Sequence, residues 1–103
     1  MTQNVQVTFR DMEASPAIRT MIEERAAHLH TFDEHVGELH AVVDMEDRLH
    51  HGIRLHLTTR GGHLEAHARQ EDPQDAVLKT VGEAFHVMER QLRKHADKQH
   101  RRR

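Results

Sequence analysis

The residues best suited to chemistry lie at the C-terminus, where residues 90–103 contain seven Lys or Arg side chains and one Asp. The preceding 89 residues contain eight basic and sixteen acidic side chains. The formal net charge of −2 therefore combines a basic segment of +6 with a remainder of −8. Concentrated Lys and Arg side chains are the usual feature of a phosphate-binding surface. We expect this segment to bind phosphate; alternatively, its cations only complement the dipole of a solvated helix end.

Twelve histidines are the second group that could do chemistry. Three of them, His40, His56 and His67, are expected on one solvent-facing side of a sheet, where neutral imidazoles could bind zinc or nickel. No helical pair has the i, i+4 spacing of zinc motifs, so we expect solvated imidazoles and no metal. Four others accompany the basic residues: His28, His35, His95 and His100. Their protonation would strengthen phosphate binding as the pH falls below neutral, which is a separate hypothesis.

Catalysis has little support in the sequence. The chain has no cysteine, and Asp44, Glu46 and Asp47 near His50 are typical of a solvated acidic turn. We expect no enzyme activity and no cofactor. No apolar run approaches the roughly 18 residues of a membrane span, and the N-terminus lacks a signal-peptide pattern. These features predict a cytoplasmic protein with no membrane partner. A length of 103 residues predicts one domain with one core.

Alternating and helical patterns define the elements that must position these side chains. Alternation predicts strands around Val5–Phe9, Leu39–Val43, Ile53–Leu57 and Leu64–Ala68. Ser15-Pro16 predicts the start of a helix that runs to about Thr31, and Asp72-Pro73 the start of a second helix with apolar residues to Leu92. Residues 46–52 predict a turn, and Arg60-Gly61-Gly62 predicts a hairpin turn.

The predicted fold is therefore α+β in the order β-α-β-β-β-α, with both helices on one face of a four-stranded sheet. The other sheet face is left in water. We expect residues 1–92 to form the domain, and residues 93–103 to be a basic extension of the second helix.

The chain resembles a known family in two segments. These are Gly61-Gly62-His63-Leu64-Glu65-Ala66, and Glu89-Arg90-Gln91-Leu92-Arg93-Lys94-His95. Together with the topology and the Ser15-Pro16-Ala17-Ile18-Arg19 helix start, they resemble the ribosome hibernation promoting factors, also called sigma-54 modulation proteins or ribosome-associated inhibitors. The resemblance covers nearly the whole chain and is to the short, single-domain class.

The resemblance implies a protein that occupies the channel for messenger and transfer RNA on the small ribosomal subunit. It would contact phosphates of the 16S-type ribosomal RNA, suppress translation under stress, and be monomeric when free. Five of the candidate RNA-binding residues match basic positions of the family: Arg19, Arg25, Arg90, Lys94 and Lys98. His28 replaces a family lysine, and four further candidates extend the basic segment: Arg93, Arg101, Arg102 and Arg103.

The sequence also departs from the family pattern. The second helix has about one turn more than is common, which would move its basic end about 6 Å outward. His35, Val87 and Ala96 each replace a usual basic residue. Two other functions therefore stay open. One is a general module for double-stranded RNA or other nucleic acid, and the other is a histidine-dependent metal or pH sensor.

Overall fold

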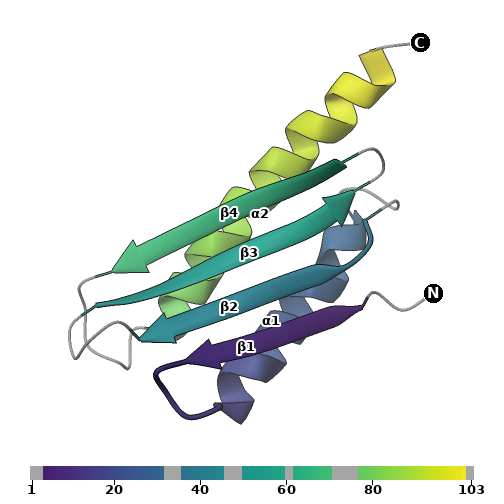
Figure 1. Ribbon diagram of the computed structural model, residues 1–103. Coiled ribbons are helices and arrows are strands. Elements are labelled where there is room, and N and C mark those ends of the chain that lie inside the picture. The colour runs from purple at the N-terminus through teal and green to yellow at the C-terminus, as the bar shows by residue number, and fades with distance from the viewer. Residues whose placement is uncertain (1–3, 32–35, 46–49, 60–61, 71–76, 102–103) are drawn as a thin grey trace.

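The computed structural model describes residues 4–31, 36–45, 50–59, 62–70 and 77–101, without the side chains of residues 30, 70 and 95–101. The elements follow the predicted order (Figure 1): β1 (Val5–Arg10), α1 (Pro16–His28), a 3-10 turn (Leu29–Thr31), β2 (Leu39–Met45), β3 (His51–Thr59), β4 (Gly62–Gln70) and α2 (Val77–Arg101). The predicted α+β fold is confirmed. Neither helix has the length and apolarity of a membrane span within this described part.

The four strands form one mixed sheet in the order β1-β2-β3-β4. β1 pairs with β2 in parallel, so the chain must cross over between them, and α1 is that crossover. β2, β3 and β4 form an antiparallel meander. Both helices lie behind the sheet in Figure 1, and the front face is uncovered. This confirms the prediction of two helices on one face.

The core lies between the sheet and the helices because each strand turns alternate side chains inward. β3 shows this alternation along its whole length, with Ile53, Leu55 and Leu57 buried. From the helices, Ile22, Phe85 and Leu92 are fully buried against them. Phe85 is the largest fully buried side chain, in a core that is otherwise mostly aliphatic, since the chain has only three Phe and no Tyr or Trp.

The start of α1 is as predicted. The Ser15 side chain accepts a hydrogen bond from the Ile18 backbone N–H at 3.3 Å, and Pro16 occupies the first turn. The 3-10 turn after His28 carries the helical segment to Thr31, the predicted end. The predicted start of the second helix at Asp72-Pro73, and Arg60-Gly61 of the hairpin, lie outside the described residues. The strands that flank the hairpin pair as far as Thr59 with Gly62.

The prediction of a turn through residue 52 is wrong, because β3 already begins at His51. His51 is 1% exposed, and its Nε2 lies 2.7 Å from the Thr80 Oγ1 of α2. Its Nδ1 has no hydrogen-bond partner among the described residues. A buried imidazole needs a hydrogen-bond partner. β3 holds the His51 ring beside Thr80, whereas a solvated turn would leave the ring in water. His50 and His51 were predicted to lie in a turn only because they belong to a polar stretch of the sequence.

We predict that Thr80→Val will destabilise the fold by about 1–3 kcal/mol, since it removes the polar partner of a buried imidazole. Urea unfolding measures the effect. Thr58→Val is the matched control, because Thr58 is exposed on β3 and should change stability by less than about 0.5 kcal/mol. Adding His51→Leu to Thr80→Val should recover part of the loss, because both polar partners are then removed. Equal effects of the two threonine substitutions would contradict the structural role of this pair.

The strands and helices carry a net positive formal charge, with eleven Lys or Arg residues against seven Asp or Glu residues, although the whole chain is at −2. Of the described residues between these elements, Asp11, Glu13 and Glu38 are acidic and none is Lys or Arg.

Candidate nucleic-acid interface

The basic end of α2 starts where the core ends. Leu92 is the last fully buried residue among the described side chains of the helix, and the neighbouring Gln91 Nε2 donates to the Glu65 carbonyl oxygen of β4 at 2.9 Å. Beyond this point α2 continues to Arg101, about 14 Å further along its axis. Figure 1 shows this part projecting past the end of the sheet. The helix thus presents its last turns away from the body, and it runs without a break through the predicted boundary at residues 92 and 93.

Three basic side chains come together at the base of this projection. Arg90, Arg93 and Lys94 are all exposed. Because residues three and four apart are neighbours on a helix surface, these three cations share one face. The backbone continues the same stripe through positions 98 and 101. The side chains of Lys98 and Arg101, as well as Arg102 and Arg103, lie outside the described residues, so their predicted role stays a prediction.

The predicted basic residues of α1 occupy two separate places. Arg25 and His28 are exposed in its last turn. Arg25 borders α2, because its Nη2 is 3.9 Å from the position that a Cβ on Gly82 would take. Arg19 lies on the other side of the helical layer, with its guanidinium carbon 5.7 Å from the centroid of the Phe9 ring of β1. β1 and β4 are opposite edges of the sheet, so Arg19 is apart from the cations beside β4.

Gly82 lies where α1 and α2 meet and has room for a methyl group. An added Cβ would be 3.5 Å from the Met21 Cε, which is ordinary van der Waals contact. We predict that Gly82→Ala raises the free energy of unfolding by roughly 0.5–1 kcal/mol, because alanine is the better helix former. Thermal unfolding measures this. Leucine at the same position would displace Met21 or Arg25, so Gly82→Leu serves as the control and should be less stable than Gly82→Ala. A loss of stability in the alanine variant would contradict the available space.

His40, His56 and His67, the three histidines considered for zinc or nickel, are not brought together in the structure. Within the part of the chain that the structure describes, no three His, Cys, Asp or Glu residues are placed to hold a metal ion. His40 and His56 are paired across β2 and β3, but His67 lies opposite Arg54. It is His63 that stacks on His56, with ring centroids 4.7 Å apart. The suggestion of His40, His56 and His67 as ligands is therefore wrong, because the register places His67 beside an arginine.

Existing hydrogen bonds also occupy two of these imidazoles. The His40 Nε2 is 3.0 Å from the Thr8 Oγ1, and the His56 Nδ1 is 3.1 Å from the Glu65 Oε1. Three residues of the pH hypothesis are outside the description: His35 as a whole, and the side chains of His95 and His100. That hypothesis stays a prediction.

Two features of the structure could not be found from the sequence. Gln91 was noted only as part of a family-like segment, and its hydrogen bond to β4 depends on the register between helix and sheet. Arg10, Arg54 and Arg69 come from three strands, and their spacing along the chain does not indicate that they line one depression on the open sheet face.

The fold and the basic helix end define a class: a small α+β domain with a two-helix layer, an open sheet face and a cationic projection. The chain matches the family described as Sigma 54 modulation protein / S30EA ribosomal protein over residues 5–100. It therefore belongs to this family, as the sequence resemblance indicated. The family is one of ribosome-associated factors and is not an enzyme class.

Solved structures show the same fold. The chain is similar to a ribosomal subunit interface protein from Coxiella burnetii, with a TM-score of 0.76 and 23% identity over 92% of this chain and 99% of that chain. It is also similar to the N-terminal domain of Protein Y from Thermus thermophilus, with a TM-score of 0.75 and 16% identity over 90% of this chain and 99% of that chain. No curated protein sequence matches the chain.

Proposed function

We propose that this protein binds the small ribosomal subunit in the channel for messenger and transfer RNA and suppresses translation under stress. The observation that carries the proposal is the α2 end, where Arg90, Arg93 and Lys94 share one exposed face beside Leu92, at the edge of the core. Family membership supports the ribosome as the partner. The fold of a protein titled a ribosomal subunit interface protein agrees with this.

The mechanism is occlusion and needs no chemistry. The cations at the end of α2, with Arg25 and His28 at the end of α1, would contact phosphates of the 16S-type ribosomal RNA. Arg and Lys contacts to phosphate release counterions, so binding should weaken steeply as salt rises. The domain is only about 18 Å thick along its shortest axis, and it would fill a channel as a slab. We expect the free protein to be monomeric, and we place its activity in the cytoplasm with the ribosomes.

Co-sedimentation with purified small subunits across a salt series tests the proposal. The protein should pellet with the small subunit at low salt and be displaced by messenger RNA with a bound initiator transfer RNA. Each phosphate contact contributes roughly 0.7–0.9 to the slope of log affinity against log salt. The large subunit is the matched control. Equal pelleting with both subunits, or with any duplex RNA, would favour a general nucleic-acid module instead.

A further inference from the structure

The sheet face that the helices leave uncovered has a depression at one end. A row of paired residues crosses the four strands there, from Arg10 through Asp44 and Gly52 to Arg69. Gly52 has no side chain to fill the middle of the row. The result is an open depression of about 370 Å³. Arg54, from the next row, is also part of its lining.

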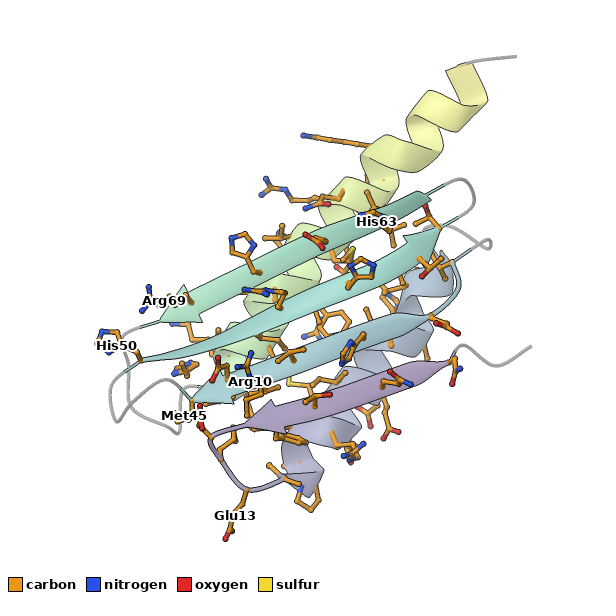
Figure 2. All side chains as sticks on the ribbon, in the orientation of Figure 1. Arg10, Glu13, Met45, His50, His63 and Arg69 are labelled. Carbon is orange, nitrogen blue, oxygen red and sulfur yellow. The ribbon has the colours of Figure 1, made fainter. Side chains whose placement is uncertain are left out.

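Three exposed arginines surround this depression: Arg10, Arg54 and Arg69. Figure 2 labels Arg10 and Arg69 at the same end of the sheet. Arg10 and Arg69 are three strand spacings apart, which is about 14 Å, and Arg54 lies between them on β3. Asp44 is the one acidic residue among those that line the depression. One guanidinium group can donate two hydrogen bonds to the oxygens of one phosphate. Three separated arginines therefore suit successive phosphates of a strand better than a single anion.

The other end of the same face carries a pair of flat rings. The imidazoles of His56 and His63 are stacked at 4.7 Å with an angle of 23° between their planes. The side chain of His56 is 43% exposed, and His63 is exposed at the opposite end of β4 from Arg69 (Figure 2). Histidine rings are among the side chains on which unpaired bases stack. His63 and Arg69 are about 20 Å apart along β4.

We propose that the open sheet face binds single-stranded RNA, with phosphates on Arg10, Arg54 and Arg69 and a base on the His56–His63 pair. Its extent suits about four nucleotides. A duplex keeps the faces of its bases stacked on one another and cannot offer one to the imidazole rings, so single strands are selected. Among the residues that line the depression, the three arginines outnumber Asp44, in a chain that is acidic overall.

This inference does not rest on the proposed ribosome binding, because the helical layer lies on the other side of the sheet (Figure 1). The test uses the full chain with a fluorescently labelled, uridine-rich single-stranded RNA, read by fluorescence anisotropy at low salt. The triple variant Arg10→Gln, Arg54→Gln and Arg69→Gln should lose about tenfold or more in affinity. The variant His56→Ala with His63→Ala should lose about fivefold or more.

The matched control is Lys79→Glu, an exposed cation of α2 outside both surfaces, and it should retain single-strand binding. An oligonucleotide with the same phosphates but no bases should bind about tenfold more weakly than the RNA. Circular dichroism verifies folding, and Arg54→Gln alone, an exposed substitution, replaces the triple variant if the latter is unfolded.

Three outcomes would overturn the proposal. They are unchanged binding by the open-face variants, an equal loss of binding in the Lys79→Glu control, and equal binding of the base-free strand. Tighter binding of a polyglutamate peptide than of RNA would point to a protein segment on this face and would also overturn it. These RNA-binding measurements contain no ribosomes. A negative result in them would therefore not affect the co-sedimentation experiment with the small subunit.

Discussion

Reversing three charges, Arg90→Glu, Arg93→Glu and Lys94→Glu, is expected to reduce small-subunit affinity on the order of a thousandfold at low salt. The three side chains share one exposed face at the point where α2 leaves the sheet. Removing a charge-assisted contact to phosphate weakens binding, and an added carboxylate repels the same phosphate. The slope of log affinity against log salt should fall by roughly 2–3. Co-sedimentation across a salt series measures both quantities.

Lys79→Glu is the matched control, because Lys79 is an exposed cation in the first turn of the same helix. It should retain near-normal affinity. The structure predicts that stability is unaffected in both variants, since none of the four side chains contributes to the core. A triple variant that pellets as well as the wild type would refute the assignment of this interface. Equal losses in Lys79→Glu would mean that net charge, and no particular surface, determines binding.

Phe85→Ala is expected to lower the free energy of unfolding by about 3–5 kcal/mol. Phe85 is fully buried on α2, where it fills space against the inward side chains of the sheet. A domain of this size has a total stability of only about 5–15 kcal/mol, so the variant should be close to unfolding at physiological temperature. Guanidinium unfolding monitored by circular dichroism gives the value.

Leu78→Ala, on the same helix, provides the comparison. Leu78 is 42% exposed, so its truncation should cost less than about 0.5 kcal/mol. If both variants unfolded at the same denaturant concentration, Phe85 would not occupy the centre of the core. Losing ribosome binding in Phe85→Ala but not in Leu78→Ala would be explained by unfolding alone, because neither residue belongs to the candidate interface.

Local patterns were sufficient to predict most of the described secondary structure. The alternation Val5–Phe9 and the Ser15-Pro16 cap each depend on residues next to one another, and the structure confirms both. His51 was misassigned because its burial comes from Thr80, 29 positions further along the chain. A pattern that covers a few residues has no information on such a distant partner.

The candidate interface could be predicted only in part from the sequence, again because some of its contacts join residues far apart in the chain. Arg90, Arg93 and Lys94 are close in sequence, so helical spacing was enough to group them. Arg19 matched a basic family position, yet it lies at the β1 edge beside Phe9, away from that group. The misplacement of His67 shows a further limit. Which imidazoles meet across a sheet depends on the strand register, and alternation along one strand does not determine it.

The acidic connecting segments have a consequence for how the protein approaches a polyanion. Their charges repel phosphate, whereas the net positive charge of the helices and strands attracts it. Asp11, Glu13 and Glu38 are exposed, so this repulsion reaches into solvent over about the Debye length. When the protein approaches the polyanion with a connecting segment in front, electrostatic repulsion opposes contact. The charge pattern therefore filters encounter orientations, and association rates should depend on salt even where the final contacts are unchanged.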